Sequence, residues 1–177
     1  ERSNLSESAR LLAILNPESL ITLKANGIAI EELSLLSESA QYQAVKTPEG
    51  LITLRDNGIT IEELAQLAKD DGLSGVLGGA QEKAIKNPAG LITLRDKGIT
   101  IEELAKLGRF GQWQAIDTPY RLIDLETRGI KVEELAKLSD AGQAEAIYIP
   151  EGLITLRDKG ITIEELAKLS DAGQEKA

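Results

Sequence analysis

The chain has 177 residues, of which 42% are hydrophobic, and its 20 Lys and Arg residues against 29 Asp and Glu residues give a net charge of −9. It has no Cys, His or Met, which excludes disulfides, thiolate and imidazole metal ligands, and every catalytic mechanism that needs His or Cys. The acidic balance opposes nonspecific attraction to nucleic acid or anionic lipid, and it favours basic partners.

No segment of the sequence has the length and hydrophobicity of a membrane span, and none has the pattern of a secretory leader. We therefore expect no membrane partner. The sequence does not identify a compartment, since a cytoplasmic protein and a protein delivered into a host cell both fit it. The absence of an initiating Met leads us to expect a segment of a longer bacterial protein.

The prolines of the chain mark a tandem repeat. They are separated by 31, 40, 31 and 31 residues, and each is followed ten residues later by a glycine. The prolines are Pro17, Pro48, Pro88, Pro119 and Pro150, and the glycines are Gly27, Gly58, Gly98, Gly129 and Gly160. We predict one array over residues 1–177, with repeats at 5–35, 36–66, 67–106, 107–137 and 138–168 and a partial repeat at 169–177.

The third repeat is nine residues longer than the others, and the additional residues lie near residues 67–76. Three interpretations stay open for this insertion: a surface loop without a role, a bend in the array, or a binding loop.

Within a repeat, the sequence predicts three short helices, which in the second repeat lie at 37–46, 48–57 and 61–67. We expect the residue before four of the prolines to cap the proline-led helix with its side chain, as Thr47 would before Pro48. Gly58 is expected to end that helix in a left-handed conformation, and Thr60 with Glu63 forms the pattern of a capping box. The equivalent expected caps elsewhere are Asn16, Asn87 and Thr118.

Each predicted helix has only about two turns and is too short to persist alone in water. A repeat of this size cannot enclose its own Leu and Ile side chains, so we expect it to bury them against the next repeat. The predicted fold class is all-α, an α-solenoid of five repeats of about 31 residues with three short helices in each.

A pair of adjacent glutamates recurs in every repeat. The pairs are Glu31-Glu32, Glu62-Glu63, Glu102-Glu103, Glu133-Glu134 and Glu164-Glu165. Glutamates in a first helical turn are favoured by capping and by the helix dipole, but they can also attract basic groups, for which Glu62, Glu102 and Glu133 are the candidates. Adjacent residues on a helix diverge by about 100°, so the pair cannot act on one bond. We predict no catalytic residue, no metal site and no cofactor.

One position varies strongly between otherwise similar repeats. It is occupied in turn by Leu11, Tyr42, Glu82, Trp113 and Ala144. Aromatic side chains at such a position anchor partners or cover the edge of the array. Together with the nearby Phe110 and Tyr148, Tyr42 and Trp113 are the candidate apolar anchors.

A basic position near the end of the proline-led helix recurs as Lys24, Arg55, Arg95 and Arg157, and it is interrupted by Glu126. The helix dipole favours cations at the C-terminal end of a helix. A charged face exposed to solvent is therefore enough to explain these residues without a ligand. If the chain binds nucleic acid instead, the candidate residues are Arg55, Arg95, Arg109 and Arg157.

The segments "GITIEELAKLSDAGQ" at 160–174 and "GIKVEELAKLSDAGQAEAI" at 129–147 resemble the repeat of transcription-activator-like effectors and their bacterial relatives. In that family, a loop between two helices reads one DNA base per repeat. The resemblance implies a superhelix and would assign base reading to the loop pairs Glu38-Ser39, Arg109-Phe110, Asp140-Ala141 and Asp171-Ala172.

The sequence thus predicts a noncatalytic scaffold that presents a surface built from repeats to a protein or peptide, with a preference for basic partners. The alternative is nucleic-acid binding through the loops between helices.

Overall fold

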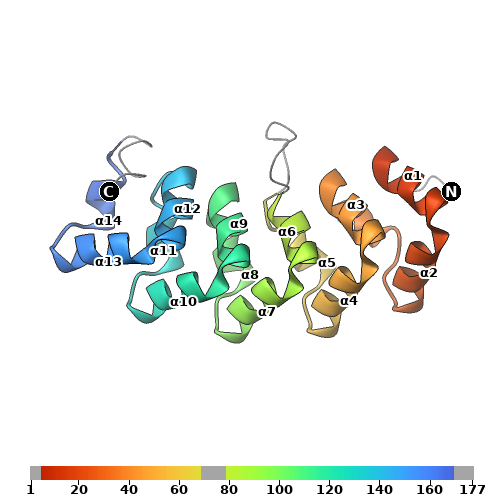
Figure 1. The fold of residues 1–177 in the computed structure, drawn as a ribbon, viewed down its shortest axis with the longest axis horizontal. Helices are drawn as coiled ribbons and strands as arrows, with labels where there is room; N and C mark the ends of the chain where they lie inside the picture. The colour runs from red at the N-terminus through yellow and green to blue at the C-terminus, as the bar shows by residue number, and fades with distance from the viewer. Residues whose placement is uncertain (1–4, 69–78, 170–177) are drawn as a thin grey trace. The chain divides into compact units, whose positions relative to one another are not determined.

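The computed structural model describes residues 5–68 and 79–169, and within these ranges every regular element is helical (Figure 1). There are fourteen α-helices and one 3-10 helix in the described parts. The all-α prediction is therefore confirmed. The insertion expected after Leu67 lies outside the described residues from residue 69 onward, as do the pair Asp171-Ala172 and the partial repeat from residue 170. The chain divides into two compact halves, residues 1–92 and 93–177.

The first half contains α1, α3 and α6 in one row, with α3 between the other two, and α2 beside α4 (Figure 1). Its elements are α1 (Glu7–Leu15), α2 (Pro17–Ala25), η1 (Glu32–Leu35), α3 (Glu38–Lys46), α4 (Pro48–Asp56), α5 (Ile61–Leu64), α6 (Ala80–Lys86) and the beginning of α7 (Pro88–Asp96). The three helices predicted for the second repeat are α3, α4 and α5.

The second half repeats this arrangement, with α9 beside α12 and α10 beside α13 (Figure 1). Its elements are the end of α7, α8 (Ile101–Leu104), α9 (Arg109–Asp117), α10 (Pro119–Thr127), α11 (Val132–Leu135), α12 (Asp140–Tyr148), α13 (Pro150–Asp158) and α14 (Ile163–Leu166).

The predicted helix signals after each proline-led helix are confirmed. Gly58 has φ 77° and Gly129 has φ 88°, a left-handed conformation that glycine adopts without steric cost. Two residues later the capping box forms, because Thr60 N donates to Glu63 Oε2 (2.7 Å) and Glu63 N donates to Thr60 Oγ1 (3.1 Å). The chain therefore reverses and restarts as a helix at a position fixed by local chemistry.

The predicted side-chain caps before proline are wrong where the structure defines them, at Asn16, Thr47 and Thr118. Thr47 Oγ1 donates to the Gln43 carbonyl (3.2 Å) and accepts from Gln43 Nε2 (2.7 Å). The reason is that Thr47 also ends the preceding helix, where its N–H bonds to Gln43 O. Because Pro48 has no N–H, the first turn of α4 needs one donor fewer to be satisfied.

The core is made by aliphatic side chains that recur at equivalent positions. Leu54 and Leu64 in the first half and Leu125 and Leu135 in the second half are fully buried. A following repeat contributes to this burial, since Ile130 is fully buried whereas its equivalent in the last repeat, Ile161, is 37% exposed.

Buried glutamines join consecutive repeats. Gln143 Oε1 accepts from Gly108 N of the preceding repeat (2.6 Å), and its Nε2 donates to Leu138 O of its own repeat (2.8 Å). Gln41 and Gln81 make the same pair of contacts in the first half, with Ser6 N and Ser37 N as the donors from the preceding repeat. A buried amide satisfied on both sides fixes the distance between neighbouring repeats as well as their burial.

A second junction contact forms at Gly108, a glycine that stands where the second repeat has Ser37. Ser37 caps α3 with its own hydroxyl, which accepts from Ala40 N (3.3 Å). Gly108 has no side chain, and Asp140 of the next repeat caps α9 instead, its Oδ1 accepting from Phe110 N (2.8 Å) and Gly111 N (3.2 Å). A Cβ on Gly108 would lie 2.4 Å from that oxygen, so glycine is required for this cap.

Candidate binding surface on helix α10

The recurrent glutamates are used largely within the fold. The second member of each pair accepts a backbone N–H at the start of its helix, as Glu63 and Glu103 do. The first member forms an ion pair with the preceding repeat in the second half, where Lys106 bonds to Glu133 and Lys137 to Glu164. These partners and distances assign most of the predicted acidic surface to capping and to repeat junctions.

The side-chain hydrogen bond from Lys106 holds the pKa of Glu133 below its usual value, and the same bond raises the pKa of Lys106. Glu62 and Glu102, the other two glutamates predicted to attract basic groups, are exposed and form no ion pair with any described residue. Their carboxylates remain accessible to a partner.

The predicted aromatic anchors lie on three helices, and each exposed ring has a cation beside it. The Tyr42 ring on α3 lies 5.9 Å from Lys46 Nζ, and the Phe110 ring on α9 lies 5.2 Å from the Arg109 guanidinium. Trp113, one turn further along α9, is half-buried.

Tyr148 lies in the last turn of α12, whereas Phe110 lies in the first turn of α9. Gln143, in the first half of α12, contacts the residue that precedes α9, so the two helices begin at the same end. Phe110 and Tyr148 therefore lie at opposite ends of this helix pair and do not form one cluster.

The residue pairs implied by the resemblance to effector repeats begin helices. Glu38-Ser39, Arg109-Phe110 and Asp140-Ala141 are the first two residues of α3, α9 and α12 respectively. Asp140 caps α9, so its carboxylate is directed toward the N-terminal end of that helix.

The recurrent arginines reach back to the preceding repeat. Arg157 Nη1 donates to the Arg128 carbonyl at the end of α10, and the Arg55 guanidinium lies over Gly27, where a Cβ would be 3.0 Å from its Nη1. Arg95 lies half-buried in the last turn of α7. Arg55 and Arg157, predicted as nucleic-acid ligands, thus lie against the helix turn of the preceding repeat.

Helix α10 departs from its copies at the positions that face its neighbours. Where α4 and α13 read "PEGLITLRD", α10 reads "PYRLIDLET", so that Arg121 replaces a glycine and Glu126 replaces the recurrent arginine. Both replacements line a hollow in the second half. The sequence signalled only the break at Glu126, because the consequence of Arg121 depends on what packs against it.

The first hollow lies where α10 begins and where α12 passes into α13. It has a volume of about 380 Å³ and is lined by Arg121, Tyr148, Ile149, Pro150 and Glu151. The Arg121 guanidinium donates to the Tyr148 carbonyl and lies 4.8 Å from the centre of the Tyr148 ring. Tyr148 and Ile149 are 50% and 48% exposed, so the hollow combines apolar surface with a cation already held in position.

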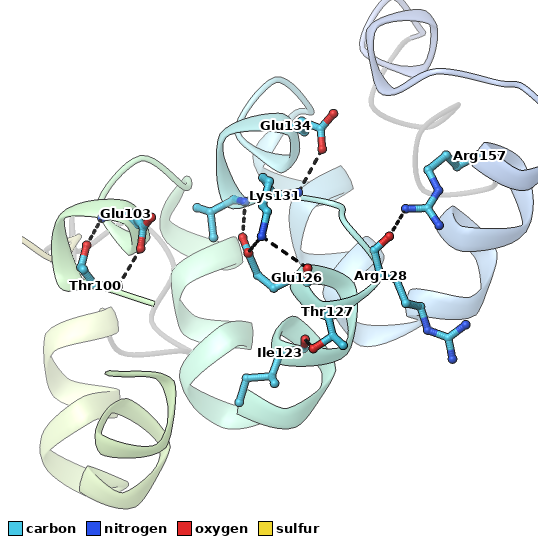
Figure 2. A network of polar contacts seen from close by, with 10 residues as sticks. Thr100, Glu103, Ile123, Glu126, Thr127, Arg128, Lys131, Glu134 and Arg157 are labelled. Atoms are coloured by element: carbon cyan, nitrogen blue, oxygen red, sulfur yellow. Dashed lines mark hydrogen bonds and ion pairs between the residues drawn. The ribbon is translucent and has the colours of Figure 1, made fainter. Parts of the chain in front are cut away.

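The second hollow, which we call the Gly98 hollow, lies between the turn after α7 and the last turn of α10. Its volume is about 440 Å³, and its walls are Lys97, Gly98, Ile99 and Glu103 on one side and Ile123, Glu126, Thr127 and Lys131 on the other. Figure 2 shows Glu126 and Lys131 facing each other within this part of the structure.

Glu126 is held by two donors from its own repeat. Its Oε2 accepts from Lys131 Nζ (2.7 Å) and its Oε1 from Val132 N (2.8 Å). The hydrogen bond to Glu126 raises the pKa of Lys131, which keeps this lysine charged. No group of three or more acidic side chains in the described ranges is arranged to hold a metal ion.

Among the helices of residues 5–68 and 79–169, none is both long enough and apolar enough to cross a membrane. Comparisons of the chain with protein-family models, with curated proteins and with solved structures give no match.

Proposed function

We propose that the chain is a noncatalytic scaffold, an α-solenoid of five repeats that binds a protein or peptide partner across α10. The single observation that carries this proposal is that Arg121 and Glu126, two of the residues by which α10 differs from its copies, each line a hollow, whereas the junction glutamine Gln143 is retained. Repeat proteins keep the buried contacts between repeats constant and vary the surface that meets the partner.

The α-solenoid is supported by the equivalence of the junctions. Glutamine contacts of the same geometry join repeats in the first half and in the second half, and each spans only neighbouring repeats. An extended distance distribution in small-angle X-ray scattering is the expected result, and a compact, globular distribution would contradict it.

Apolar and charged features support a peptide as the partner. Tyr120, Tyr148 and Ile149 are 71%, 50% and 48% exposed, and aromatic side chains of this exposure are frequent anchors in protein interfaces. Tyr42 and Phe110 offer further exposed rings, and the carboxylates of Glu62 and Glu102 favour a partner with basic residues.

The experiment is selection of binding peptides from a displayed random library with the full chain as bait. The matched control is a chain in which three residues of α10 and one residue after it are returned to the repeat consensus, by Tyr120→Glu, Arg121→Gly, Glu126→Arg and Lys131→Thr. We expect peptides that bind the unchanged chain and lose at least about tenfold in affinity for the control, the equivalent of about 1.4 kcal/mol.

Peptides that bind both chains equally would remove α10 from the proposal, and Tyr42→Ala and Trp113→Ala would then test the remaining anchors. A nucleic-acid partner is tested in parallel by gel shifts at low salt. Binding that falls steeply with salt and depends on Arg109 would favour that alternative.

A further inference from the structure

The turn after α7 lacks the arginine contact that the turns at Gly27 and Gly129 receive from the following repeat. Arg157 donates to the carbonyl of Arg128, the residue before Gly129, and Arg55 lies over Gly27. At Gly98 the following repeat supplies Glu126, which has no donor, and nothing lies within 4 Å of where a Cβ on Gly98 would be. The contacts at the turns of Gly27 and Gly129 therefore indicate which chemical group the turn at Gly98 would accept.

Lys131 does not replace the missing arginine. Its ammonium bonds to Glu126 Oε2 (2.7 Å) and lies 3.4 Å from Glu126 O, so it is turned toward its own repeat. In contrast, Arg157 crosses to the preceding repeat, as Figure 2 shows. Within the described residues no backbone N–H outside the helices donates to the carbonyl of Lys97, the equivalent of the Arg128 carbonyl.

We propose that the Gly98 hollow binds the guanidinium group of an arginine side chain presented by a peptide partner. This inference rests on the proposed function and names the chemistry that the α10 surface recognises.

The walls of the hollow suit each part of an arginine side chain. The Lys97 carbonyl lies at the C-terminal end of α7, where the helix dipole favours a cation. Glu103 and Glu126 supply carboxylates, and a carboxylate has acceptor sites beyond the one or two that are used here. Ile99 and Ile123 provide apolar surface for the methylene stem.

A guanidinium fits this arrangement better than an ammonium does. It presents five N–H donors in a plane and so can bond to a carbonyl and a carboxylate at the same time. Lys131 already supplies an ammonium to Glu126, and yet the Lys97 carbonyl receives no bond from it.

The test is a titration of the ¹⁵N-labelled full chain, followed by NMR, with the peptide acetyl-Gly-Arg-Gly-amide. The same peptide with citrulline, which has the shape of arginine without its charge, and the same peptide with lysine are the matched ligands. The matched variants are Glu126→Arg/Lys131→Thr, which supplies the arginine from within the chain, and Glu49→Gln, which removes an exposed carboxylate outside the hollow.

We expect saturable shifts of the Gly98 and Ile99 amides with the arginine peptide and at least about tenfold weaker binding of the citrulline and lysine peptides. Glu126→Arg/Lys131→Thr should lose the binding and Glu49→Gln should keep it. The inference would be overturned if the citrulline or lysine peptide bound as tightly as the arginine peptide, if the shifts occurred elsewhere, or if the double variant still bound. The absence of saturable shifts in the unchanged chain would also overturn it, whatever the variants do.

Failure here is distinguishable from failure of the proposed function. If library peptides bind the unchanged chain in preference to the consensus chain but keep their affinity when their arginines are replaced by citrulline, the scaffold stands and the arginine site is wrong.

Discussion

The turn at Gly27 in the first half and the turn at Gly98 in the second half are equivalent parts of the repeat, but different chemistry lies against them. An arginine lies over Gly27, whereas Gly98 faces a hollow with Glu126 on its far wall. The two glycines nevertheless have similar φ values of 76° and 89°. The arginine contact is therefore not what sets the turn, and the position can vary without changing the backbone.

The contacts that the two halves share should matter most for stability. Gln143→Leu removes the partners of Gly108 N and Leu138 O, and Gln41→Leu does the same in the first half. Each variant should lose about 2–6 kcal/mol, because each of the two unsatisfied backbone groups costs about 1–3 kcal/mol. Chemical denaturation measures the change. The control is Gln66→Leu at an exposed position, whose free energy of unfolding should stay within about 0.5 kcal/mol of that of the unchanged chain. A Gln143→Leu protein as stable as the unchanged chain would refute the junction role.

The next largest effect concerns the cap that differs between the halves. Gly108→Ala should cost about 1–2 kcal/mol, because the new Cβ displaces Asp140 and so removes the cap of α9. Gly108→Ser combined with Asp140→Ala should recover most of this loss, since serine would cap its own helix as Ser37 does. Unfolding curves of Gly108→Ser, of Asp140→Ala and of the double variant check this. A double variant whose loss of stability equals the sum of the losses of the two single variants would contradict it.

A smaller effect should follow from making the two turns alike. Glu126→Arg/Lys131→Thr should raise the free energy of unfolding by about 0.5–1 kcal/mol, because an arginine would then reach the Lys97 carbonyl at the protein surface. Arg157→Ala should lower it by a similar amount. Thermal unfolding of the full chain measures both, and destabilisation by the double variant would show that the turns are not interchangeable.

The smallest effect is a dependence of stability on pH that comes from the ion pairs of Lys106 and Lys137 in the second half. In the first repeat the exposed Leu35 stands at the equivalent position, and it cannot form such a pair. The pKa of Glu133 is held below its usual 4.5 by the hydrogen bond from Lys106, and that of Glu164 is lowered by Lys137. A carboxyl group whose pKa is lower in the folded chain than in the unfolded chain stabilises the fold at pH values above its unfolded-state pKa. This contribution is lost as the pH falls through the folded-state pKa. Glu133→Gln/Glu164→Gln should therefore be less stable than the unchanged chain at pH 7 and equally stable at strongly acidic pH. A difference that does not shrink with falling pH would exclude the ion pairs as its cause.

Local features of the fold were predictable from the sequence, and contacts between repeats were not. Gly58 and the Thr60–Glu63 box are decided by residues within a few positions of each other, so the sequence indicates them directly. Gln143 and Asp140 act on residues 35 and 30 positions away, and no pattern along the chain reveals such partners. The caps expected before proline failed for a related reason, since Thr47 serves two helices at once.

The candidate site was predictable only as a break in a pattern. The replacement of arginine by Glu126 stood out in the sequence, but the hollow beside it depends on where Lys131 turns. Arg121 gave no signal because a charged residue in a first helical turn is common. Its effect comes from the neighbouring helix, against which the equivalent Gly50 packs so closely that a Cβ would lie 2.0 Å from the Ile85 carbonyl.

Thr47 both ends α3 and begins α4, so no further residue separates the two helices at this junction, which we call the elbow. One extra residue there would rotate the following helix by about 100° and point its leucines away from the interior. The nine additional residues of the third repeat follow the short "IEEL" helix, at the other end of the repeat. A designer wishing to graft a peptide or a tag into this protein should open the chain at that boundary and leave the elbows intact.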